Sequence, residues 1–98
     1  MDRVVTMVRG RVEPHQEQQF RDAFPADSVD DLPDFLLGTM LVHESGSDRW
    51  AVVTLWRDRA ALDEYRRSVD TPGAVAAFRA VGVEPEVTIW DADRVLMK

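Results

Sequence analysis

The residues of this chain with the clearest capacity for chemistry are His43, Arg79 and Tyr65. Imidazole titrates near neutral pH, so His43 could act as a general base. The guanidinium of Arg79 could hold an anionic oxygen through charge-assisted hydrogen bonds. Tyr65, the only tyrosine, joins an apolar ring to a hydroxyl group. The second histidine, His15, opens an expected helix, and we expect it at the surface.

The sequence offers few other routes to catalysis. It contains no cysteine, which excludes a thiolate nucleophile, a thiolate metal site and a disulfide framework. The two histidines lack carboxylates at the spacing of a zinc site, and the aspartates of residues 27–34 lack the alternating ligands of a calcium loop. No phosphate-binding glycine loop or nucleophile elbow occurs. We therefore expect neither a metal nor a bound cofactor.

Charge and hydropathy restrict the expected partners. The formal net charge is -6 at pH 7. This charge disfavours nucleic acid and anionic membrane surfaces, because both attract surfaces rich in Lys and Arg. The start of the chain lacks the pattern of a signal peptide, and no apolar run approaches the roughly 20 residues of a membrane helix. We expect one cytoplasmic domain that spans residues 1–98.

Hydrophobic periodicity predicts the elements that position these side chains. Alternation with a period of two indicates strands, whereas an apolar stripe at three- and four-residue spacing indicates helices. The predicted order is β-α-β-β-α-β, an α+β ferredoxin-like fold whose antiparallel four-stranded sheet carries helices on one face. The expected strands are 4–12, 35–44, 50–56 and 86–91, with 93–97 as a continuation, and the expected helices are 15–24, a turn at 28–32, one that opens at residue 58 and a short one that includes Phe78.

The second and third strands predict a dimer. A sheet with helices on one side should alternate apolar and polar residues, because its other face meets water. These two strands are instead apolar on both faces, with Leu36 expected on the open face and Leu37 and His43 on the helix face. A second copy of the sheet would cover the open face, so we expect a homodimer. The residues expected at this interface are Met40, Val42, Ala51, Val53 and Leu55.

Residues 49–78 read RWAVVTLWRDRAALDEYRRSVDTPGAVAAF, a buried strand that ends in tryptophan, an amphipathic helix, a Thr-Pro-Gly break and a second short helix. Together with the segments PDFLLG and AVAAFRA, this order resembles the antibiotic biosynthesis monooxygenase family of dimeric α+β barrels. The resemblance implies an apolar ligand pocket between the sheet and the helices. Its expected lining is Trp50, Val52, Trp56, Leu62, Tyr65, Phe20 and Phe78, with His43 or Arg79 at its polar end.

The resemblance also implies a chemistry. The protein would be a cofactor-independent monooxygenase that oxidises a polycyclic aromatic or polyketide-like phenol to a quinone. Such an enzyme deprotonates the substrate, and the resulting carbanion reduces molecular oxygen directly, without flavin or metal. In this interpretation Trp56 is both pocket wall and catalytic residue, His43 takes the phenolic proton, and Arg79 holds the phenolate.

The chain departs from the family pattern at two positions. Quinone-forming relatives carry an asparagine four residues before the tryptophan and a tyrosine six residues after it, where this chain has Val52 and Leu62. The chain also lacks the axial histidine of the haem-degrading branch. Two alternatives therefore stay open: a cyclase or isomerase on the same scaffold, and a non-catalytic dimer that binds small molecules. The candidate residues have structural alternatives too, with Trp56 in the core and His43 and Arg79 at the surface.

Overall fold

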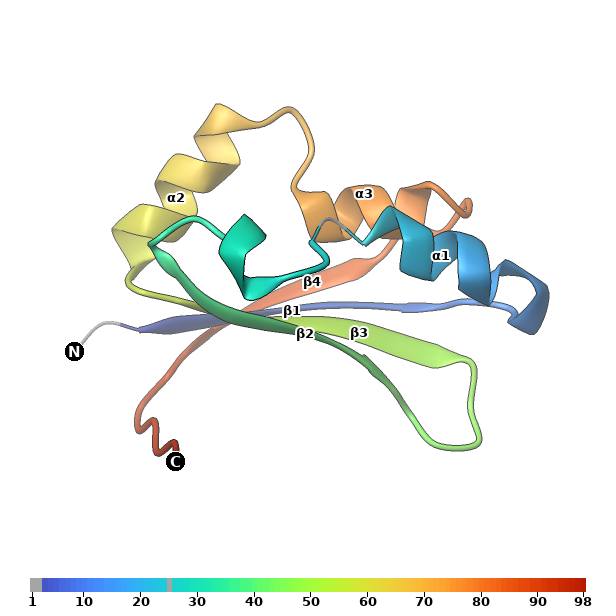
Figure 1. Ribbon diagram of the computed structural model, residues 1–98, viewed down its shortest axis with the longest axis horizontal. Helices are drawn as coiled ribbons and strands as arrows, with labels where there is room; N and C mark the ends of the chain where they lie inside the picture. Colours follow the sequence, from blue (N-terminus) through green and yellow to red (C-terminus); the bar gives the residue numbers. More distant parts are fainter. Residues whose placement is uncertain (1–2, 25) are drawn as a thin grey trace.

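The computed structural model describes residues 3–24 and 26–98, and it has the predicted α+β architecture. Four antiparallel strands form a sheet in the order β2-β3-β1-β4, and the helices lie on one of its faces (Figure 1). This order is that of the ferredoxin-like fold. The strands are β1 (Val4–Arg11), β2 (Leu36–His43), β3 (Arg49–Trp56) and β4 (Glu86–Asp91).

Two of the helical elements begin at a side chain that caps them. Asp58 accepts a 2.7 Å hydrogen bond from the backbone N–H of Ala61 at the start of α2, and this bond lowers the pKa of the Asp58 carboxyl group. The short helical turn over Val29–Asp31 begins with a reciprocal capping box between Ser28 and Asp31. The helical elements are η1 (Pro14–Gln16), α1 (Glu17–Ala23), η2 (Val29–Asp31), α2 (Arg59–Ser68) and α3 (Gly73–Arg79).

The core lies between the sheet and the helices in two clusters. The larger one is built around Phe20 and Phe78, whose ring centroids are 4.6 Å apart. Gly10 of β1 lets this packing form, because a Cβ atom there would lie only 2.9 Å from the Phe78 ring. Burial of a side chain of this size contributes about 1.5–3 kcal/mol to the stability of the folded state through the hydrophobic effect. The smaller cluster consists of Val4, Trp56 and Leu62.

One expected face assignment is wrong at the start of β2. Strict alternation places Leu36 on the open face and Leu37 on the helix face. A register irregularity instead pairs Leu36 with Trp56 and Gly38 with Leu55. Leu36 therefore packs beside Trp56 on the helix side, and Leu37 is exposed. The reason is that one extra residue in a strand shifts the alternation by one position.

The expected continuation of β4 over residues 93–97 is also wrong. β4 is an edge strand that pairs with β1 alone. The last bond of this pairing runs from the N–H of Ala92 to the carbonyl oxygen of Arg3 at 2.9 Å. Because β1 begins at Val4, it offers β4 no further partner. Residues 93–98 therefore leave the sheet without regular structure (Figure 1).

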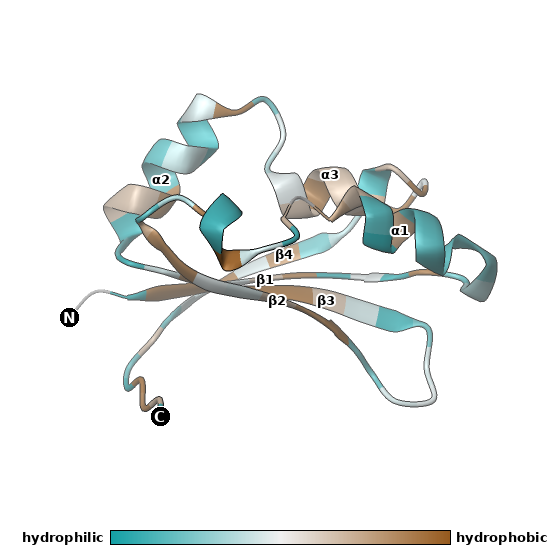
Figure 2. Cartoon of the chain, in the orientation of Figure 1, coloured by the Kyte–Doolittle hydropathy of each residue, from teal (hydrophilic) through white to brown (hydrophobic). Residues whose placement is uncertain are grey.

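The sheet face away from the helices is largely apolar. The register aligns Met40, Val53 and Met7 in one row across β2, β3 and β1. Met40 is 57% exposed and Trp90 of β4 is 54% exposed. Figure 2 shows hydrophobic residues along the central strands. Contiguous apolar patches of this kind mark interaction surfaces in soluble proteins. Among the described residues, no helix combines the length and apolar character needed to cross a bilayer.

Candidate functional site

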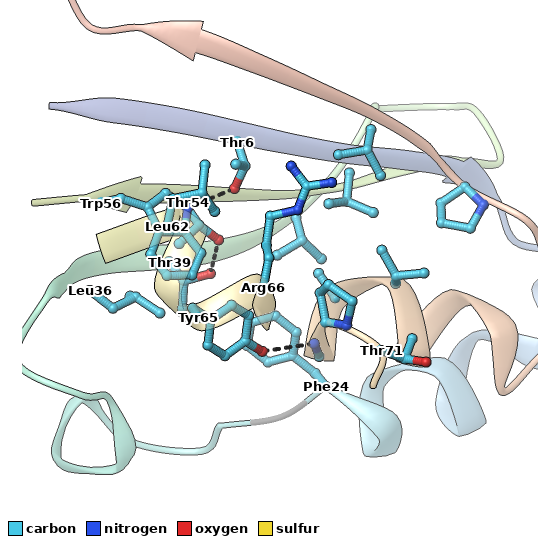
Figure 3. A pocket seen from close by; sticks show the side chains of 18 of the residues that line it. Thr6, Phe24, Leu36, Thr39, Thr54, Trp56, Leu62, Tyr65, Arg66 and Thr71 are labelled. Atoms are coloured by element: carbon cyan, nitrogen blue, oxygen red, sulfur yellow. Dashed lines mark hydrogen bonds between the residues drawn. The ribbon is translucent and has the colours of Figure 1, made fainter. Parts of the chain in front are cut away.

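A cavity of about 530 Å³ lies between the sheet and the helices α2 and α3. Figure 1 shows α2 rising away from the sheet toward its C-terminal end and the chain returning to the sheet at α3. The cavity lies beneath this connection, and all four strands contribute to its walls. Its volume is in the range of pockets that hold ring-containing small molecules. Figure 3 shows the side chains that line it.

A row of three threonines forms the polar part of the sheet-side wall. Thr6, Thr54 and Thr39 lie opposite one another on β1, β3 and β2, and all three line the cavity. The hydroxyl oxygens of Thr39 and Thr54 are 2.9 Å apart and share a hydrogen bond (Figure 3). Sequence alone does not single out this row, because it depends on the register of three strands. The sequence indicates only that each threonine occupies a strand position whose side chain should face the helices.

Trp56 forms part of the cavity wall and is also firmly packed in the core. Its indole stacks on the ring of Phe35 with centroids 6.1 Å apart, and it packs at 5.2 Å from the ring of Tyr65. Its Nε1–H donates a 2.9 Å hydrogen bond to the hydroxyl oxygen of Thr6. The buried indole nitrogen is therefore satisfied, and the same bond fixes the orientation of the Thr6 hydroxyl.

Tyr65 presents a second oriented hydroxyl group. Its oxygen accepts a 2.9 Å hydrogen bond from the backbone N–H of Gly73 at the start of α3 (Figure 3). A hydroxyl that accepts such a bond keeps its own hydrogen for donation. Thr6 is in the same state, since its oxygen accepts from Trp56. The cavity thus combines ring walls with two held hydroxyl donors.

The model of the family described as antibiotic biosynthesis monooxygenase matches residues 3–81. The chain belongs to this family. No curated protein matches the sequence.

Several solved structures share the fold. A candidate antibiotic biosynthesis monooxygenase from Caulobacter crescentus is 19% identical, with 95% of this chain and 92% of that chain covered and a TM-score of 0.72. A protein from Mycobacterium tuberculosis is 19% identical, with coverage of 98% and 100% and a TM-score of 0.72. SnoaB, a cofactor-independent oxygenase from Streptomyces nogalater, is 19% identical, with 100% of both chains covered and a TM-score of 0.60. At these identities the likeness establishes the common fold.

Two apolar residues line the cavity where the family resemblance implies polar ones. Val52 and Leu62 both contribute to its walls. They stand where an asparagine and a tyrosine occur in the quinone-forming members of the antibiotic biosynthesis monooxygenase family. The hydroxyls of Thr6, Thr54 and Tyr65 supply polar atoms to the same cavity in this chain.

Arg79 lies at the rim of the cavity, but its guanidinium is already engaged. Its Nε and Nη2 atoms donate to the carboxylate of Glu84 over distances of 2.8 to 3.1 Å. The hydrogen bond from Arg79 lowers the pKa of Glu84, and the hydrogen bond to Glu84 raises the pKa of Arg79. Both groups therefore stay charged and paired. This pairing reduces the capacity of Arg79 to hold the anionic oxygen that the sequence suggested for it.

His43 lies outside this cavity, at the hairpin end of the sheet. Its ring stacks on Trp50 with centroids 4.2 Å apart and an interplanar angle of 8°. Its Nε2 atom also forms a hydrogen bond with the carbonyl oxygen of Ser47. The expected helix-facing parity of His43 agrees with this stacking. Its expected place at the polar end of the pocket is corrected, because β2 and β3 extend beyond the cavity at this end.

Phe20, Trp50 and Phe78 form closed core instead of cavity wall. Phe20 packs edge-on against Trp50 with centroids 5.5 Å apart. The helices α1 and α3 lie close along this half of the sheet (Figure 1), and the three rings fill the space beneath them. Their expected role as lining residues is therefore corrected. They support the half of the domain that adjoins the cavity.

The charged residues at the cavity lie at its exposed rim. They are Arg66, Asp70, Arg79 and Glu84. Across residues 3–24 and 26–98, no cluster of three or more metal-ligating side chains is present. The described walls of the cavity thus offer rings and hydroxyls inside and charges at the entrance.

Proposed function

We propose that the protein is a cofactor-independent monooxygenase that oxidises a polycyclic aromatic or polyketide-like phenol to a quinone. The proposal rests on the cavity of about 530 Å³, which combines apolar and aromatic walls with the oriented hydroxyls of Thr6 and Tyr65. A fused-ring phenol matches this size and this distribution of polarity. Family membership supports the same class of reaction.

The reaction requires only the electrons of the substrate. A methylene carbon of the fused-ring phenol loses a proton to solvent water, and the negative charge spreads onto the oxygen across the ring. The carbanion then transfers electrons to O₂, and a carbon–oxygen bond forms. The oxygen–oxygen bond breaks with release of one water molecule, and the second oxygen atom remains as the quinone carbonyl. Overall, the CH₂ group and O₂ become C=O and H₂O.

In this mechanism Tyr65 and Thr6 stabilise the developing anion. Hydrogen-bond donors that are held in place where negative charge develops lower the barrier, because they need no reorganisation during the reaction. Tyr65 is held by the N–H of Gly73, and Thr6 is held by the indole of Trp56. Trp56 therefore acts as a wall for the aromatic rings and as the group that positions Thr6.

Purified protein is expected to oxidise an anthrone-type phenol and to consume one O₂ for each quinone formed. A chelator such as EDTA should leave the rate unchanged, because the electrons pass directly from substrate to oxygen. An oxygen electrode and the quinone absorbance measure the two sides of the reaction, and heat-denatured protein controls for spontaneous oxidation.

Two outcomes of this experiment would contradict the proposal. Tight binding of several phenols without turnover of any would identify a non-catalytic small-molecule binder. Conversion of the substrate without oxygen uptake would identify a cyclase or isomerase that uses the cavity for orientation.

We also propose that the protein is a homodimer through the open face of its sheet. Met40, Val42, Ala51, Val53 and Leu55 project from this face in two adjacent strands. Burial of these apolar side chains against a second copy stabilises the pair through the hydrophobic effect. Light scattering at micromolar concentration should therefore give about twice 11.1 kDa. A monomer that stays soluble at the same concentration would contradict this interface.

A further inference from the structure

Arg66 differs from the other arginine at the cavity in having no carboxylate partner among the described residues. It lies in the last turn of α2, directly after Tyr65. Figure 3 shows its side chain extending from α2 into the cavity. Its neighbour Arg67 is paired with Glu64 at 2.8 Å, and Arg79 is paired with Glu84 at 2.8 Å. Within residues 3–24 and 26–98, Arg66 forms no such ion pair.

The remaining charges at the rim leave the guanidinium of Arg66 available. Glu84 and Arg79 neutralise each other through their bidentate contact. Asp70 also lines the cavity, in the connection that follows α2, but Arg66 and Asp70 form no ion pair in the described structure. A guanidinium binds a carboxylate or phenolate through two parallel N–H···O bonds when no protein carboxylate already occupies it.

We propose that Arg66 is a specificity-determining residue that binds an anionic oxygen group, in particular a carboxylate, on the aromatic substrate. This inference rests on the proposed function, because it assumes that the cavity holds a fused-ring molecule. The rings lie between Trp56 and the apolar walls, and the acidic substituent reaches the cavity rim beside α2. The substrate class is thus narrowed from aromatic phenols to aromatic phenols that carry an acidic group.

Isothermal titration calorimetry with a matched pair of probes tests this assignment. The probes are 9-anthracenecarboxylate and its neutral analogue 9-anthracenecarboxamide, which share size and ring system. The variants are Arg66→Gln and Arg67→Gln, which each remove one positive charge from the same turn of α2. A charge-assisted hydrogen bond at a partly exposed site predicts that Arg66→Gln weakens carboxylate binding by about tenfold. Carboxamide binding should stay unchanged.

The Arg67→Gln control should change carboxylate affinity by less than about twofold, since exposed charges far from a ligand are screened by salt. Competition between the two probes checks that they occupy one site. Equal affinity of the wild-type protein for both probes, unaffected by Arg66→Gln, would overturn the role of Arg66 and leave the aromatic cavity standing. Absence of binding by either probe would overturn both the inference and the proposed function.

Discussion

Replacement of Phe78 by alanine is expected to lower the free energy of unfolding by about 3–5 kcal/mol. The Phe78 side chain is 0% exposed and packs against the ring of Phe20. It also lies directly on the backbone of Gly10, where a Cβ atom would be 2.9 Å from the ring. Truncation leaves a void that these neighbours cannot fill, because a ring on one side and a strand backbone on the other have little freedom to move.

Urea denaturation followed by circular dichroism measures this loss. The total stability of a domain is only about 5–15 kcal/mol, so the variant should unfold at a much lower urea concentration. Val29→Ala is a suitable control, since Val29 is 74% exposed and its truncation should change stability by less than about 0.5 kcal/mol. All variants are compared at one protein concentration, because the proposed dimerisation would make stability concentration-dependent. A loss below 1 kcal/mol for Phe78→Ala would mean that the core is built differently.

Replacement of Tyr65 by phenylalanine is expected to lower kcat for an anthrone-type phenol by about a hundredfold, the effect typical of removing one oriented donor to an oxyanion. The substitution keeps the ring that packs at 5.2 Å from Trp56, so the cavity wall is preserved. It removes the hydroxyl that the N–H of Gly73 holds in place. Because this donor acts mainly on the charge that develops during the reaction, KM should change much less than kcat.

Ser68→Ala provides a matched control for this variant. It also deletes a hydroxyl from α2, but the Ser68 hydroxyl donates to the carbonyl oxygen of Tyr65 and is exposed. Steady-state kinetics on both variants should therefore show a large loss of kcat for Tyr65→Phe alone. A Tyr65→Phe enzyme within threefold of the wild-type kcat would remove Tyr65 from the mechanism, and circular dichroism verifies that both variants fold.

Much of the domain could be predicted from local patterns in the sequence. The β-branched run between Trp50 and Trp56 predicts a strand because β-branched and aromatic side chains pack well on a pleated sheet. Asp58 marks the start of α2 because a carboxylate satisfies the free N–H groups of a helix end. The segment from Arg49 to Phe78 also indicates the antibiotic biosynthesis monooxygenase family, and the family model that matches residues 3–81 confirms this prediction. The strand and the start of the helix depend on neighbours within a few residues along the chain.

The composition of the cavity, in contrast, was decided by contacts between distant residues. Thr6, Thr54 and Thr39 form one row only because β1, β3 and β2 pair in a particular register. The register irregularity after Leu36 turned that residue toward Trp56, and strict alternation could not reveal it.

The orientation of each charged or aromatic candidate depended in the same way on its partner in space. Arg79 is occupied by Glu84, whereas Arg66 extends into the cavity. Trp50 and Trp56 have the same parity on β3, yet only Trp56 lines the cavity. The reason is that α3 lies close to the sheet whereas α2 rises from it (Figure 1), and the angle of a helix to a sheet is set by packing across the whole core.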